Sequence, residues 1–214
     1  MLKKSAPPSY RFVGGLALVL MGCAQPSTRS VRDPDASGCA DERLPVAEPW
    51  VGDVTVDSLH DVCDGATCRA IEGNVFLWGY SYQDGPAWSS TDLEALSCVT
   101  AVSGALTVHG NPELTSLRGL ENLTSVGDLS MGDHPQLADL AALSHLTNVE
   151  GSFALSGTQA VNLRGMSGLT RVGGSLDIDG NGALTALEGL ERLASVGALD
   201  IAYNPSLVSL QGLD

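Results

Sequence analysis

Residues 102–125 read VSGALTVHGNPELTSLRGLENLTS, and close variants of this stretch fill the sequence that follows. Five units begin at Val102, Val126, Val149, Val172 and Val196, spaced by 24, 23, 23 and 24 residues, and the fifth is incomplete. A unit this short cannot bury its own apolar face, so it becomes stable only by stacking on its neighbours. The repeat therefore predicts a solenoid, a fold that mainly presents surface.

The apolar positions of the first unit predict what each coil looks like. Leu106 and Val108 have the two-residue period of a strand, which puts both side chains on one face. A run with a period of three follows, and it suits a coil that turns corners better than an α-helix. That run is Leu114, Leu117, Leu120 and Leu123. In the third unit we expect Val161 in the slot of Leu114, with one residue missing between Val161 and Leu163.

Two further slots predict the turns. Asn satisfies nearby backbone groups with its amide and tolerates left-handed backbone, and Pro interrupts regular structure. The first slot holds Asn111, His134, Thr158, Asn181 and Asn204, with Pro112, Pro135 and Pro205 directly after three of them. The second slot holds small residues, which indicates close approach of coils or a special backbone shape. Its members are Gly119, Ala142, Gly165, Gly189 and Gly212.

The strand core LxVxxN matches that of leucine-rich repeats. Together with CRAIEGNVFLWG at residues 68–79, it resembles the receptor L-domain family over roughly residues 54–214. That family comprises the solenoids of insulin- and epidermal-growth-factor-type receptors and of many bacterial surface proteins. The resemblance implies a mainly β, right-handed solenoid of 23–24-residue coils. It implies binding rather than any particular ligand, because these scaffolds bind unrelated molecules.

Residues 1–22 have the pattern of an export signal, with Lys3, Lys4 and Arg11 ahead of an apolar core too short to span a bilayer. The core ends in Leu-Met-Gly-Cys at residues 20–23, which resembles the bacterial lipobox and implies cleavage before Cys23 and lipidation of its thiol. The alternative is an ordinary secretory signal with an incidental cysteine. We expect a lipid anchor in a bacterial cell envelope, at the outer membrane or cell surface, with residues 23–50 carrying the anchor and a flexible tether.

Five cysteines are an odd number, which lipidation of Cys23 would explain. Cys39, Cys63, Cys68 and Cys98 would then form two disulfides in an oxidising compartment. Three pairings are open, and we favour Cys68 with Cys98 because they fall near equivalent slots of adjacent coils. Zinc is the rival interpretation for Cys63 and Cys68, but no nearby histidine completes a ligand set.

The net charge of −14 argues against nucleic acid as a partner, because a phosphate backbone would be repelled. Loss of Lys3, Lys4 and Arg11 with the signal would reduce the 11 basic residues to 8, against 25 acidic ones, for a net charge near −17. Acidity also keeps a surface protein soluble, which is the simpler explanation.

One segment satisfies the pattern of an EF-hand calcium loop. Its candidate ligands are Asp177, Asp179, Asn181 and Glu188. Every residue of the match also lies in register with the repeat, and no flanking amphipathic helices are present. We therefore favour coil structure and keep calcium as a distant alternative, with no other cofactor expected.

Aromatic residues cluster ahead of the repeats. Alignment with the later units makes Val75 and Leu77 core, so Phe76 and Trp78 face outward beside His109 of the next coil. Tyr80, Tyr82 and Trp88 fall in an insertion of about seven residues, the kind of place where solenoids carry binding loops. The candidate binding surface is therefore Phe76, Trp78, Tyr80, Tyr82, Trp88 and His109. The alternative is that these side chains cap the first coil.

Motifs of catalysis are absent: the histidines show no HExxH spacing and no G-x-S-x-G occurs. We expect no enzyme but a cell-envelope binding module for a protein or glycan, with a passive structural scaffold as the alternative. Residues 51–100 are expected to form disulfide-containing coils with the aromatic insertion, and residues 101–214 the repeat solenoid. That solenoid has no C-terminal cap, so we expect either a truncated reading frame or self-association through the last coil.

Overall fold

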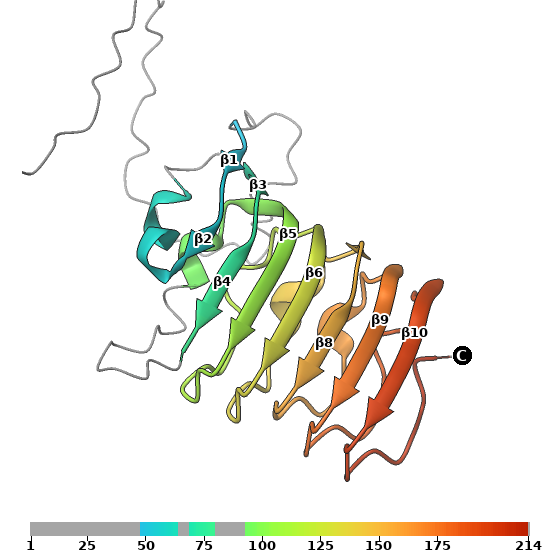
Figure 1. Cartoon of the computed structure of the whole chain (residues 1–214). Helices are drawn as coiled ribbons and strands as arrows, with labels where there is room; N and C mark the ends of the chain where they lie inside the picture. Colours follow the sequence, from blue (N-terminus) through green and yellow to red (C-terminus); the bar gives the residue numbers. More distant parts are fainter. Residues whose placement is uncertain (1–47, 64–68, 80–92, 214) are drawn as a thin grey trace, which may run out of the picture. The chain divides into compact units, whose positions relative to one another are not determined.

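The computed structural model describes residues 48–63, 69–79 and 93–213, and it confirms a mainly β solenoid of coils about 23 residues long. The strands in this part of the chain form one ten-stranded sheet, and all their pairings are parallel. Helical structure in the same residues is limited to four short 3₁₀ segments. Successive coils lie side by side from β4 to β10 (Figure 1).

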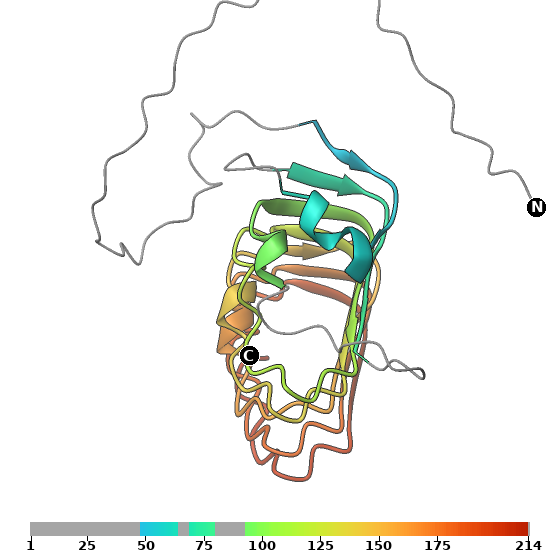
Figure 2. The same ribbon diagram turned by 90° about the vertical axis from the view of Figure 1, so that its left-hand side faces the viewer.

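Each coil supplies two strand segments that meet at a bend, as Figure 2 shows with the coils nearly end-on. Four strands run through the bend: β5 (Val99–His109), β6 (Ser125–Gly132), β9 (Arg171–Asp179) and β10 (Ser195–Ala202). Elsewhere a short strand supplies the first segment: β1 (Trp50–Val51), β3 (Arg69–Glu72) and β7 (Asn148–Val149). Three others supply the second: β2 (Val54–Thr55), β4 (Val75–Trp78) and β8 (Phe153–Ser156). The register shifts between Val102 and Ala105, at the bend of β5.

The leucines point inward, as the repeat predicts. Leu114 and Leu117 are fully buried and Leu120 and Leu123 are 1% exposed, so the whole period-three run is core. The period has a structural cause: Leu120 N–H donates to Leu117 O and Leu123 N–H to Leu120 O, each at 3.1 Å. Consecutive turns closed by i→i+3 bonds bring every third side chain to the same side. In the second and third units these turns become η3 (Ala141–Leu143) and η4 (Arg164–Met166).

The third unit corrects one expectation. Val161 is 54% exposed, whereas Ala160 is fully buried and takes the slot of Leu114. The missing residue therefore lies in the turn before Ala160, where Thr158 and Ala160 are separated by a single residue. The deletion falls there because the three-residue spacing from Ala160 to Leu163 and on to Met166 must be kept for all three side chains to reach the core.

The asparagine slot forms a buried polar ladder between coils. Asn111, His134 and Asn181 are fully buried and Thr158 is 1% exposed. Asn181 Oδ1 accepts the Thr158 N–H at 3.1 Å and the Thr158 hydroxyl at 2.7 Å. His134 Nε2 lies 3.0 Å from Val108 O, so it takes over the bond that Asn181 Nδ2 makes to Leu155 O. These side chains satisfy the backbone of the preceding coil, which the sequence interpretation did not expect. They also bond locally, since Asn181 Nδ2 donates to Asp179 O at 3.1 Å, and this confirms one half of that interpretation.

The prediction that the asparagine slot itself adopts left-handed backbone is wrong, because the left-handed residue is the one before this slot. Positive φ angles occur at Gly110 (70°), Asp133 (61°), Gly157 (62°), Gly180 (64°) and Tyr203 (49°). The turn reverses the chain at that residue, and only then can the next side chain point into the core. Three of the five positions are glycine, which adopts this backbone without steric cost.

The small-residue slot is explained by both of the predicted reasons. Gly119 and Gly189 have φ angles of 108° and 115°, and a Cβ on either would lie 1.9 Å from a carbonyl oxygen of the previous coil, that of Leu93 or Leu163. Successive coils therefore touch backbone to backbone on this side.

The first two described coils each carry a 3₁₀ segment, η1 (Val56–Asp61) and η2 (Leu93–Leu96), and a disulfide joins the residues that follow these segments. Cys63 bonds to Cys98, with a Cα–Cα distance of 5.7 Å. The preference for Cys68 with Cys98 is therefore wrong. The two 3₁₀ segments bring Cys63 to the start of β5, a proximity that the repeat register does not encode. Cys39 and Cys68 lie outside the described residues, as does Cys23.

Candidate binding surface

The second strand segments form a flat sheet whose outward side chains make two ladders across the coils. One ladder runs through Phe76, Thr107, Ser130, Ala154, Asp177 and Asp200. The other runs through Trp78, His109, Gly132, Ser156, Asp179 and Ala202. We call these twelve residues the outer sheet face, which is turned toward the viewer in Figure 1. Each coil contributes one residue to each ladder. From β4 to β10 these residues change from aromatic through small to acidic.

Trp78 and His109 form the aromatic end of this face. They are direct cross-strand neighbours on β4 and β5, and their rings stack with centroids 5.3 Å apart and an interplanar angle of 25°. The imidazole is fixed on its other side, since His109 Nε2 lies 2.8 Å from Ser130 Oγ. Trp78 nevertheless remains 57% exposed. The result is a large aromatic surface held in one orientation, with a polar hydrogen-bonding group beside it.

Gly132 makes room for the imidazole. A Cβ at this position would lie 2.6 Å from Cε1 and 2.8 Å from Nδ1 of His109, and 2.8 Å from Ser156 Oγ. Any larger residue would push the histidine off the sheet and disturb its contact with Trp78. The sequence interpretation missed Gly132 and Ser130 as supports of His109, although both occupy outward slots of the next coil.

Partial burial lowers the pKa of His109 below the usual value of 6.5. The nearby Asp133 acts in the opposite direction and raises this pKa, whereas His134 lowers it further. The unfolded chain then binds a proton at a higher pH than the folded chain, so stability falls as the pH drops through 6.5 toward the folded pKa. We expect acidification to destabilise the wild type more than His109→Gln. Urea unfolding of both proteins on either side of this window measures the difference, and parallel pH profiles would contradict it.

The remaining aromatic candidates divide by region. Phe76 is half-buried and lies in the ladder beside Trp78, as the alignment predicts. Tyr80, Tyr82 and Trp88 lie outside the described residues. The face therefore unites Phe76, Trp78 and His109, and the role of the insertion stays a prediction.

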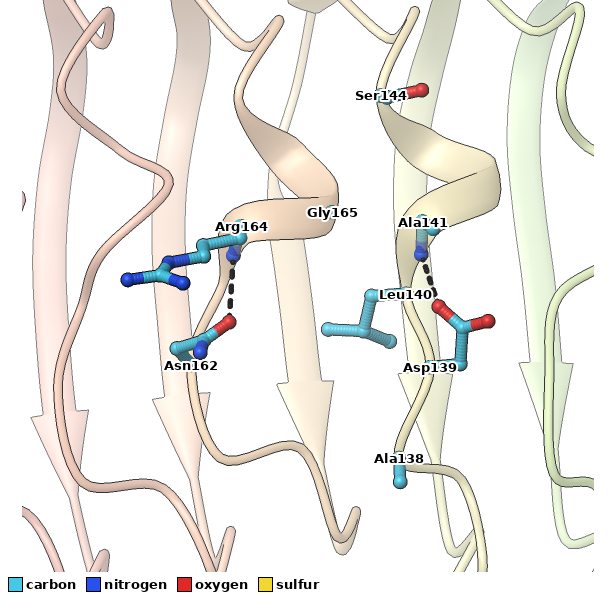
Figure 3. Close-up of a pocket in the computed structure, with 8 residues that line it drawn as sticks. All are labelled: Ala138, Asp139, Leu140, Ala141, Ser144, Asn162, Arg164 and Gly165. Carbon is cyan, nitrogen blue, oxygen red and sulfur yellow. Dashed lines mark hydrogen bonds between the residues drawn. The ribbon is translucent and has the colours of Figure 1, made fainter.

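A second candidate is a hollow of about 310 Å³ on another side of the coils, between η3 and η4. Figure 3 shows two of its polar side chains bonded to the backbone: Asp139 Oδ1 accepts the Ala141 N–H at 2.8 Å, and Asn162 Oδ1 accepts the Arg164 N–H at 3.1 Å. Arg164 also forms an ion pair with Glu188. Because these groups serve local turns, we place the candidate site on the outer sheet face.

The residues of the calcium pattern are dispersed by the coil. Asp177 and Asp179 face outward on β9, whereas the buried amide of Asn181 is committed to the polar ladder. Glu188 lies on the side of the coil where it pairs with Arg164. Among the residues that the structure describes, no three histidine, cysteine, aspartate or glutamate side chains gather as a metal ligand set.

Comparison with models of known protein families gives no match for this chain, and comparison with curated proteins gives none either. Within the described part of the chain, no helix has the length and apolar character needed to cross a membrane.

Proposed function

We propose that this chain is a cell-envelope lipoprotein whose solenoid presents the outer sheet face as a non-catalytic binding surface. The observation that carries the proposal is Trp78, which stays 57% exposed although the stack on His109 fixes its ring. A rigid exposed indole loses little conformational entropy on binding and offers a large contact area. The resemblance to receptor L-domains supports the same class of function, and residues 1–23 support the anchor through their lipobox-like sequence.

Trp78→Ala is expected to abolish capture of a partner from a detergent extract of the cell envelope while the chain stays folded. The tagged full-length chain serves as bait, and Val161→Ala, which also truncates an exposed apolar side chain, is the control. Because more than half of Trp78 is in water, we expect the variant to lose only about 1 kcal/mol of unfolding free energy.

The passive scaffold remains the second candidate, and the same variant separates the two. If the aromatic end merely caps the first coil, Trp78→Ala will lose several times more stability than this and leave any capture unchanged. Urea unfolding of the bait proteins reads this out alongside the capture.

We also propose that a protein consisting of these 214 residues self-associates through its last coil. Leu199, Val208 and Leu210 are 40%, 86% and 60% exposed there, and β10 is paired on one side in the described sheet. Exposed apolar side chains beside an open strand edge favour association. Light scattering is expected to show a species larger than the monomer, and Val208→Lys with Leu210→Lys should shift it to the monomer. A wild-type monomer at high concentration would contradict the proposal.

A further inference from the structure

The outer sheet face carries negative charge at one end and no lysine or arginine at any of its twelve positions. Asp177 and Asp200 are direct neighbours on β9 and β10, and Asp179 lies in the adjacent ladder. Like charges placed opposite each other on parallel strands repel, and their separation stays close to the strand spacing of about 5 Å. A cation bound between them would relieve that repulsion.

These carboxylates are not neutralised by the protein within the described residues. The ion pairs found there join Arg118 to Glu94 and Arg164 to Glu188, on the loop side of the coils. Asp177 accepts a hydrogen bond from the Ser175 hydroxyl at 2.7 Å, which leaves its charge in place. Asp179 and Asp200 are exposed to solvent.

The aromatic end of the same face also suits a cation. The π-face of an indole attracts ammonium and guanidinium groups, and Trp78 is the most favourable type of side chain for this. Burial lowers the pKa of the neighbouring His109, which favours the neutral imidazole, the form that does not repel such a group. Two sites for cations thus lie at opposite ends of one flat surface.

The distance between the two ends sets the size of the ligand. Trp78 on β4 and Asp179 on β9 are four strand steps apart, which is about 19 Å. An extended peptide covers that span in about six residues. The floor between them consists mainly of small residues, Gly132 and Ala154 among them, with hydroxyls from Thr107 and Ser156, while the Ser130 hydroxyl bonds to His109. A peptide backbone can therefore lie flat across the strands and hydrogen-bond on the way.

As the ligand of the binding function proposed above, we propose that this face takes an extended basic segment of a partner protein, with one lysine or arginine on Trp78 and further basic residues on Asp177, Asp179 and Asp200. The charge pattern is the reason to prefer it to a neutral glycan, which Trp78 and the hydroxyls alone would also suit.

The test measures binding of fluorescein-labelled peptides to the full chain in neutral detergent at low salt. One peptide, Arg-Arg-Gly-Ser-Gly-Ser-Arg-Arg, separates two basic pairs by four residues, and the other, Arg-Arg-Arg-Arg-Gly-Ser-Gly-Ser, has the same composition with its charges together. The first is expected to bind several-fold more tightly, because only it reaches both ends. Asp177→Asn with Asp200→Asn should weaken it by roughly fivefold or more, and Trp78→Ala by about two- to fivefold.

The double variant Glu121→Gln with Glu191→Gln is the control for general attraction of a basic peptide to an acidic protein. It removes the same amount of negative charge, but from the loop side of the coils. There Glu121 and Glu191 accept the backbone N–H of Gly119 and Gly189, and the glutamine oxygen can keep both bonds. This control should change the affinity less than twofold. Equal weakening by the control, or equal binding of the two peptides, would overturn the proposal.

The outcome also separates this inference from the proposed function. If capture from the envelope extract depends on Trp78 but neither peptide binds, the surface is a binding site for something else. Binding of maltohexaose or cellohexaose that is lost in Trp78→Ala, with no response to the aspartate variants, would assign a neutral glycan instead. If capture and peptide binding both fail, the binding function itself is wrong.

Discussion

Replacement of Cys63 and Cys98 by alanine is expected to lower the unfolding free energy by about 3–4 kcal/mol. The disulfide closes a loop with a sequence separation of 35 residues, and the chain-entropy estimate for a loop of that length gives this magnitude. The bond also ties the segment after η1 to the start of β5, so it holds the first coil onto the rest of the solenoid. In the described sheet, β1 pairs with β3 and β2 with β4, so this coil has one neighbour there and depends strongly on such a link.

Urea unfolding of the double variant against the wild type measures this loss, and Cys39→Ala with Cys68→Ala serves as the matched comparison. A non-reducing peptide map should show Cys63 joined to Cys98. If the map shows Cys68 joined to Cys98, or if the variant unfolds at the wild-type urea concentration, the assignment fails. If the chain forms two disulfides, the second joins Cys39 to Cys68, and the same peptide map tests whether that bond is present.

The fold could be predicted from the sequence because its information is local and repeated. Each unit restates where the inward residues fall, so a single alignment places Val75, Leu106, Leu129 and Leu176 in one ladder, and the strand registers confirm it. The same alignment placed Trp78 beside His109, and their stacking follows from that register. The repeat period was therefore sufficient to predict that Trp78 and His109 are neighbours in the candidate site.

The features that were missed depend on contacts between coils or on the shape of one turn. Val161 and Ala160 are both apolar, and only the packed coil shows which of them faces the core. The Cys63–Cys98 bond depends on where two 3₁₀ segments dock, outside the regular repeat. The positive φ of Asp133 could have been suspected, since the same slot holds glycine in three units, but the neighbouring asparagines offered a plausible alternative.

Asn181→Leu is expected to lower the unfolding free energy by about 3–5 kcal/mol, because leucine matches asparagine in size but makes no hydrogen bonds. The amide accepts the N–H and the hydroxyl of Thr158 and donates to Leu155 O at 3.0 Å and to Asp179 O at 3.1 Å. Asn181 is fully buried, so water cannot replace these bonds, and each stranded polar group costs about 1–3 kcal/mol.

Asn204→Leu is the matched control, since Asn204 occupies the same slot in the last coil and is only half-buried. It donates to Ile178 O at 2.8 Å and accepts the Asn181 N–H at 2.9 Å, and water can take over part of both roles, so we expect a loss of about 1 kcal/mol. Asn181→Thr should recover part of the stability, because Thr158 already serves this slot one coil earlier. Urea unfolding should give the same loss in calcium and in a chelator, since the amide acts within the ladder. A loss at Asn181 no greater than at Asn204, or one that appears only with calcium, would show that the ladder does not hold the coils together.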